Sequence, residues 1–158
     1  MNRFCYILHP GRKMLHINLM FGTLIIVICV AFHVIGLAYS TAVLRAIGGV
    51  GDHPNRKKRI LLVVMVAVLV VIALHTVEIW AWAGVFWFIG EFEQFEAALY
   101  FSAVTATTLG YGDLTLSPQW RILGPFEAMG GLILFGASTA YLLQVMRGLF
   151  LVFSHDDQ

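Results

Sequence analysis

The chain has 158 residues, of which 59% are hydrophobic and only 12% are charged, and its formal net charge is +1. This composition lies outside the range of soluble globular domains and indicates an integral membrane protein. We find no phosphate-binding loop, no nucleophile–base arrangement and no nucleic-acid-binding patch in the sequence. We therefore expect no enzyme, no cofactor and no nucleic-acid partner.

Three apolar runs are long enough to cross a bilayer, which takes about 20 helical residues. They predict an all-α membrane protein with three transmembrane helices. The predicted segments are an N-terminal tail at 1–16, a first transmembrane helix at 17–45, a basic cytoplasmic loop at 46–59, an outer helix at 60–90, an inner helix at 120–153 and a C-terminal tail at 154–158. Cys5 lies in the first tail and Cys29 in an apolar run, so no disulfide is expected.

The charged residues orient these helices across the membrane. Five basic residues lie at or near the loop between the first two helices, namely Arg45, Arg56, Lys57, Lys58 and Arg59. Loops rich in lysine and arginine stay on the cytoplasmic side, so this loop is predicted inside and the acidic segment with Glu91, Glu93 and Glu96 outside. The first helix then runs from outside to inside. A re-entrant or interfacial first helix with an inside N-terminus is the alternative.

A shorter helix is predicted at 95–107, between the outer and inner helices. Its apolar part, FEAALYFSAV, is too short to cross a hydrocarbon layer of about 30 Å. We therefore expect a pore helix that enters the membrane only partway and is followed by a loop.

Residues 105–113 read TATTLGYGD. Gly110 and Gly112 can adopt positive φ at no steric cost, so the backbone here can alternate between ordinary and left-handed conformations. Consecutive carbonyl oxygens, from Thr108 to Tyr111, can then point at one axis and form cation sites. The Thr108 hydroxyl would add a further oxygen, and the Tyr111 ring would pack outward and brace the loop.

The string differs at one position from TATTVGYGD, the selectivity-filter signature of potassium channels, and residues 60–153 resemble the potassium-channel pore-domain family. The resemblance implies a homotetramer in the plasma (inner) membrane, in contact with membrane lipids, that conducts K⁺ through four filter loops. The implied filter residues are Thr108, Leu109, Gly110, Tyr111 and Gly112, of which the first four hold K⁺. K⁺ is then the permeant ligand, and no other small-molecule substrate is expected.

The resemblance also implies supporting residues around the filter. The carboxylate of Asp113 is expected behind the outer mouth, held by an aromatic donor, and Tyr100 occupies the donor position. Thr107 is a further filter-support residue, at the end of the pore helix. Val104 stands where some bacterial members of the family place a buried glutamate, so a carboxylate pair with Asp113 is not expected.

Leu109 replaces the valine that is usual in the family, and its longer side chain, which is not β-branched, could loosen or re-pack the loop. One alternative is therefore a weakly selective cation channel. A second is a non-conducting partner subunit whose first helix docks onto a larger membrane assembly. Since the first span carries no repeated arginines and only a few residues follow the last helix, neither a voltage sensor nor a cytoplasmic ligand-binding domain is expected.

Glycines of the inner helix are candidates for a gating bend. Gly131 is nearest to the position at which the inner helix bends in the family, and Gly130 and Gly136 are alternatives. Close packing of helices without a bend is the other interpretation, because small residues let membrane helices approach.

Some ionisable residues lie well inside the predicted spans. His75 and Glu78 are three apart and share a helical face, while Glu127 lies early in the inner helix and His33 lies alone in the first helix. His75, Glu78 and Glu127 could form a proton-sensitive bracket behind the filter, or a hydrogen-bonded anchor for the pore helix, which we favour. A zinc site at His75 and Glu78 would need a further ligand. His33 is interpreted as a packing or interfacial histidine.

Overall fold

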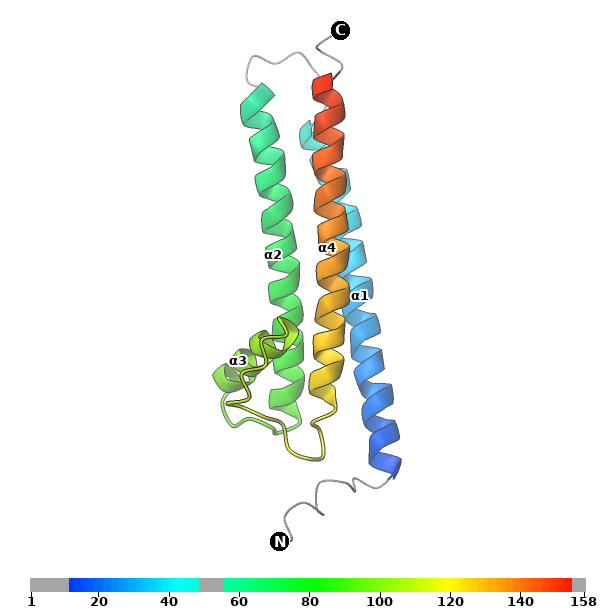
Figure 1. Cartoon of the computed structure of the whole chain (residues 1–158), viewed down its shortest axis with the longest axis vertical. Helices are drawn as coiled ribbons and strands as arrows, with labels where there is room; N and C mark the ends of the chain where they lie inside the picture. The colour runs from blue at the N-terminus through cyan, green and yellow to red at the C-terminus, as the bar shows by residue number, and fades with distance from the viewer. Residues whose placement is uncertain (1–11, 49–55, 155–158) are drawn as a thin grey trace. The chain divides into compact units, whose positions relative to one another are not determined.

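A computed structural model of the chain describes residues 12–48 and 56–154. These residues form the helices α1 (Arg12–Gly48), α2 (Arg56–Phe88), α3 (Phe95–Ala106) and α4 (Leu123–Ser154) (Figure 1). Of these, α1, α2 and α4 are long and apolar enough to cross a membrane, whereas α3 is a shorter apolar helix. No strand occurs within the described ranges, and the all-α membrane fold class is confirmed.

The inner helix begins three residues later than the sequence predicts. Residues before it form a turn, in which the amides of Trp120 and Arg121 donate to the Ser117 carbonyl at 3.0 and 2.9 Å. Pro125 then lies in the first turn of α4, where its missing N–H costs no helical hydrogen bond. The first eleven residues of the predicted tail, residues 49–55 of the basic loop and the last four residues lie outside the described part of the chain.

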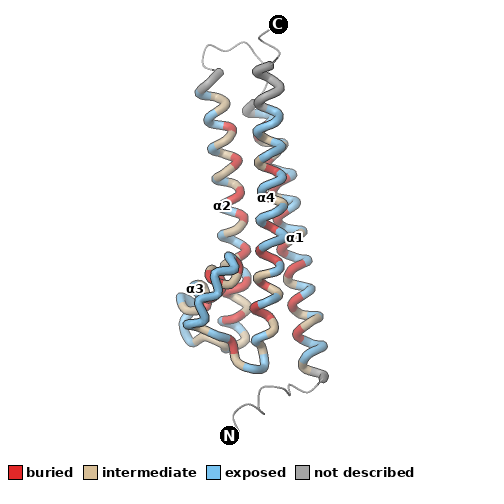
Figure 2. Tube along the Cα trace, viewed as in Figure 1, coloured by how far each residue is buried: buried red, intermediate tan, exposed pale blue. Residues whose placement is uncertain are grey.

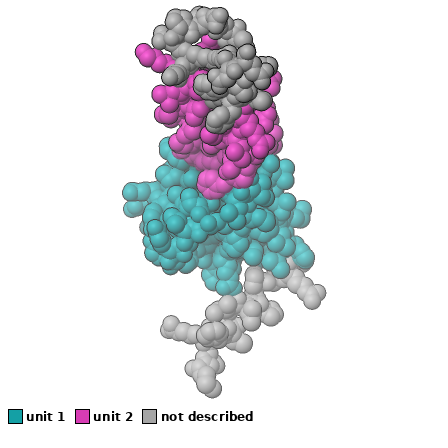
Figure 3. Space-filling view, turned by 45° about the horizontal axis from the view of Figure 1, so that its top comes forward, with its two compact units in different colours: residues 1–30, 77–133 teal, residues 31–76, 134–158 magenta. Residues whose placement is uncertain are grey.

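The chain divides into two compact units, which are described separately (Figure 3). Unit 1 comprises residues 1–30 and 77–133 and contains α3 and the loop that follows it. Unit 2 comprises residues 31–76 and 134–158, which belong to the three long helices and the α1–α2 connection.

Unit 2 has an apolar core to which each of the three long helices contributes. Buried positions, red in Figure 2, recur along each of these helices. The buried core residues are Leu37, Leu44, Val63, Ala67, Val71, Leu74 and Tyr141. At Gly36, a Cβ atom would lie 2.5 Å from Leu74 Cδ2, so α1 and α2 are in close contact there. The buried hydroxyls of Ser40 and Tyr141 are 2.6 Å apart and join α1 to α4.

Unit 1 surrounds α3 with aromatic side chains of α2. The rings of Phe86 and Phe101 meet edge to face, with centroids 5.2 Å apart, and Trp82 stacks on Phe86 at 5.7 Å. Such pairs add about 0.5–1.5 kcal/mol to the burial of their area. This packing holds the half-length helix against α2.

The first part of α1 packs in unit 1 along the start of α4. The Asn18 side chain donates a hydrogen bond of 2.6 Å to the Gln119 carbonyl, in the loop that leads into α4. Cβ atoms at Gly22 and Gly130 would approach Phe126 to 2.8 Å and Ile26 to 3.3 Å. Because α1 is one uninterrupted helix from Arg12 to Gly48, it is not re-entrant.

Candidate functional site

The candidate site is the loop between α3 and α4, and its first residues are tied to the end of α3. The amides of Leu109 and Gly110 both donate to the Val104 carbonyl, at 3.0 and 3.2 Å, and the Thr108 amide donates to the Thr105 carbonyl at 2.9 Å. These bonds satisfy carbonyls that a helix leaves without an intrahelical partner at its C-terminus. The loop therefore starts at a defined place beneath α3.

The Thr107 side chain reinforces the same junction. Its hydroxyl donates to the Ala103 carbonyl at 2.7 Å, and its amide donates to that carbonyl at 3.2 Å. Thr107 therefore stabilises the C-terminal turn of α3 in unit 1.

The loop backbone alternates in handedness. Thr108, Gly110 and Gly112 have φ of 61°, 55° and 76°, whereas Leu109 and Tyr111 between them have negative φ. Positive φ at the two glycines, predicted from the sequence, is confirmed. The positive φ of Thr108 was not predicted, because a β-branched residue in the left-handed region is unfavourable by about 1–3 kcal/mol.

The loop is exposed in a single chain. The side chains of Leu109 and Tyr111 are 58% and 67% accessible. A hollow of 620 Å³ lies between α3, the loop and the start of α4, and Tyr100, Thr108 and Arg121 are among the residues that line it. Large apolar and aromatic side chains left open in this way are typical of a surface that another chain covers.

The Tyr100 hydroxyl donates a 2.7 Å hydrogen bond to Asp113 Oδ2, directly after the loop. This hydrogen bond is the main reason that the pKa of Asp113 lies below its ordinary value. The same bond raises the pKa of Tyr100. The pairing implied by the family resemblance is therefore present, and it favours an ionised Asp113 beside a neutral Tyr100.

A second pair of hydrogen-bonded residues near the loop, Glu91 and Ser117, was not predicted from the sequence. The Glu91 carboxylate accepts two hydrogen bonds from Ser117, one from its amide at 2.6 Å and one from its hydroxyl at 2.7 Å. From the sequence, Glu91 was expected on the outside as part of an acidic segment. These hydrogen bonds join the α2–α3 connection to the segment that follows the loop.

Ser102 and Glu127 meet behind α3, and both side chains are fully buried. The Ser102 hydroxyl is hydrogen-bonded to Glu127 Oε1 and lies 2.9 Å from the Ile79 carbonyl oxygen. The contact joins α2, α3 and α4 within unit 1. Glu127 was a predicted candidate, whereas Ser102 was not predicted. The only feature of the sequence that could have indicated Ser102 is that it is a polar residue in an otherwise apolar stretch of the short helix.

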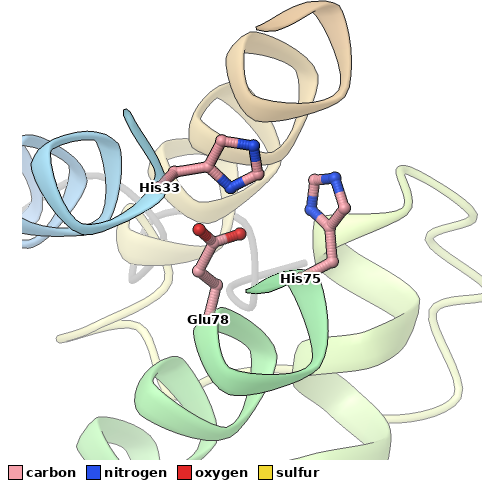
Figure 4. Close-up of side chains that lie close together, drawn as sticks. All are labelled: His33, His75 and Glu78. Atoms are coloured by element: carbon pink, nitrogen blue, oxygen red, sulfur yellow. The ribbon is translucent and has the colours of Figure 1, made fainter. Parts of the chain in front are cut away.

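His75 belongs to unit 2, whereas Glu78 and Glu127 belong to unit 1. His33 and His75 approach each other in unit 2, with ring centroids 5.0 Å apart (Figure 4). Their Nε2 atoms lie 2.9 and 3.0 Å from the Ser138 hydroxyl oxygen. His33 is therefore one of a pair of histidines that share a serine.

The three candidate hinge glycines have different surroundings. A Cβ atom at Gly131 would lie 2.3 Å from the Ala106 carbonyl oxygen, so α4 packs there directly against the end of α3. Gly130 approaches Ile26, and Gly136 has nothing within 4 Å of its Cβ position. Close packing explains Gly131 and Gly130, whereas packing within the chain does not explain Gly136.

Two long apolar helices that bracket a half-length helix and a loop of alternating backbone handedness define an ion-channel pore domain. In agreement, a family model described as an ion channel matches residues 59–148, more than half of the chain. The protein belongs to this family of two-helix, potassium-channel-like pore domains, and α1 is an additional helix before the matched region. Searches of curated proteins and of solved structures gave no match.

Proposed function

We propose that the chain is a potassium-selective channel subunit of the plasma (inner) membrane, four copies of which place their 108–112 loops around one axis. The observation that carries this proposal is the alternation of φ at residues 108, 110 and 112. Alternating handedness turns successive carbonyls toward the same side of a chain. One such strand supplies one quarter of each carbonyl ring, so a complete K⁺ site needs four copies.

Conduction follows from the chemistry of the carbonyl rings. A K⁺ ion sheds water as the carbonyl oxygens of residues 108–111 take over its coordination, and repulsion between neighbouring ions keeps transit fast. The C-terminal end of α3, at Ala106, carries the negative end of the helix dipole and adds favourable potential for a cation near the loop. The proposed function breaks no covalent bond and uses no cofactor.

The decisive experiment is ion flux into liposomes that contain only this purified chain. We expect K⁺ flux that exceeds Na⁺ flux and is blocked by Ba²⁺. Leu109→Val is the matched variant, because it restores the side chain that is usual in the family. Equal K⁺ and Na⁺ flux, made selective by Leu109→Val, would instead establish a weakly selective cation channel.

Subunit number is measured on the same preparation. Chemical cross-linking in liposomes should stop at a four-chain product, because a closed ring has no free edge. A monomer without flux at any pH or voltage would overturn the proposal and support a partner subunit of a larger assembly.

A further inference from the structure

Ser102 has more oxygen neighbours than its single proton can serve. Its hydroxyl oxygen lies 2.9 Å from the Ile79 carbonyl oxygen and in hydrogen-bond contact with Glu127 Oε1. A carbonyl and an ionised carboxylate are both acceptors only, whereas a hydroxyl donates one proton. If Glu127 were ionised, one of the two contacts would bring two oxygens together without a proton between them.

A protonated Glu127 removes this conflict. We propose that Glu127 is a neutral carboxylic acid that donates its proton to the Ser102 hydroxyl oxygen, while Ser102 donates its own proton to the Ile79 carbonyl. Each oxygen contact then contains one proton. The relay runs from α4 through α3 to α2 and makes Glu127 a positioning residue for the pore helix.

The second oxygen of Glu127 supports the same assignment. Glu127 Oε2 is buried and has no hydrogen-bond partner among the described residues. An unpaired oxygen is far more costly in a charged carboxylate than in the carbonyl of a neutral acid. A neutral carboxyl group with its proton on Oε1 is therefore consistent with the surroundings of both Glu127 oxygens.

Two further titratable groups in this part of unit 1, Cys29 and Glu78, are acids. Cys29 of α1 is buried, and both Glu78 of α2 and Glu127 lie within electrostatic reach of its thiol. A negative charge on either Cys29 or Glu78 would oppose a further negative charge on Glu127. Tyr100 of α3 is exposed and donates to Asp113 instead.

Infrared spectroscopy of the liposome-embedded protein tests the protonation directly and needs no conduction. At neutral pH, the wild-type spectrum minus that of Glu127→Gln should contain the band of a protonated carboxyl group. Glu78→Gln serves as the control for the other buried carboxyl and should leave that band in place. A difference spectrum that contains only carboxylate bands would overturn the proposal.

Flux then tests the role of the relay, which rests on the proposed channel function. Raising the pH should lower wild-type K⁺ flux, because the proton is lost and α3 is no longer tied to α4. Glu127→Gln keeps a donor toward Ser102, so its flux should remain and stay flat with pH. Ser102→Ala removes the relay and should lower flux about tenfold at neutral pH.

The two measurements separate the possible failures. If K⁺ flux changes with alkaline pH in the same way in the wild type and in Glu127→Gln, the positioning role of Glu127 is overturned. Absence of flux in every variant would overturn the proposed function, while the infrared band would still decide whether Glu127 carries the proton.

Discussion

Backbone handedness at three residues determines the shape of the proposed filter. Gly110 and Gly112 adopt positive φ without steric cost. Thr108 adopts it at a cost, and the hydrogen bonds of Thr108 and Leu109 to the end of α3 hold the strained conformation in place. At this scale, the loop depends on the two glycines for its conformation and on α3 for its position.

Gly110→Ala should reduce K⁺ flux by more than about tenfold, since a Cβ in the left-handed region costs about 1–2 kcal/mol in each subunit. Gly84→Ala is the matched control: Gly84 lies in α2 without positive φ and has nothing within 4 Å of its Cβ position. Liposome flux measures both variants. Normal flux in Gly110→Ala would show that the loop does not require left-handed backbone at this residue.

Tyr100→Phe should make K⁺ flux more sensitive to acid. The ordinary pKa of Asp113 is 3.8 and the Tyr100 hydrogen bond lowers it, so the bond stabilises the fold above about pH 4 and its contribution is lost as the pH falls through the lowered pKa. Without the hydroxyl, the pKa of Asp113 is no longer lowered by this bond, so Asp113 takes up its proton at a higher pH than in the wild type. The measurement is K⁺ flux as a function of the pH on the filter side. If flux falls at the same acidic pH in the wild type and in Tyr100→Phe, the prediction is contradicted.

At the scale of helices, α3 is the element on which the site depends. It is too short to span the membrane, and it is held by Phe86 of α2, by Glu127 and Gly131 of α4, and by the loop that follows it. Movement of the start of α4 is therefore transmitted to the end of α3, because the Gly131 backbone has no room to yield toward Ala106.

Gly131→Ala and Gly136→Ala distinguish packing from bending in α4. Gly131→Ala should lower thermal stability by about 1–3 kcal/mol, because the new Cβ meets the Ala106 carbonyl oxygen. Gly136→Ala meets nothing and should leave stability unchanged or slightly raised, as alanine favours helix. Thermal unfolding in detergent measures the stability of both variants. If Gly136→Ala is stable but conducts less K⁺ in liposomes, Gly136 is identified as a bending point of α4. Unchanged stability in Gly131→Ala would exclude tight packing at that residue.

For the whole molecule, an additional helix, α1, precedes the pore domain. The Asn18 contact with Gln119 places the beginning of α1 beside the segment that follows the filter loop, within unit 1. The beginning of α1 is therefore expected on the same side of the membrane as the 108–112 loop, and its outside-to-inside direction remains a prediction from the charges.

Cysteine labelling of intact cells should report this direction. In a Cys5→Ser background, a membrane-impermeant maleimide added outside should label His16→Cys and not Ala46→Cys, since both side chains are exposed and a helix separates them by about 45 Å. Cys29 is buried and provides the internal background control. Labelling of Ala46→Cys alone would place the N-terminus inside.

Features that depend on local chemistry could be predicted from the sequence alone. The lengths of the apolar runs determined three spanning helices, and the brevity of residues 95–107 determined a helix that cannot span. Gly110 and Gly112 determined where the loop can be left-handed. Each of these features depends only on residues close together in the chain, so periodicity, length and residue type were sufficient.

The polar side chains that meet are apparent only once the helices are packed together. The contacts of Ser102 with Glu127, of Asn18 with Gln119 and of Glu91 with Ser117 join residues far apart in the chain. In a membrane, lipid and protein neighbours are both apolar, so hydropathy does not reveal which face of a helix contacts another helix. The positive φ of Thr108 was not predicted either, because backbone hydrogen bonds to the end of α3 stabilise it against the local preference of a β-branched residue.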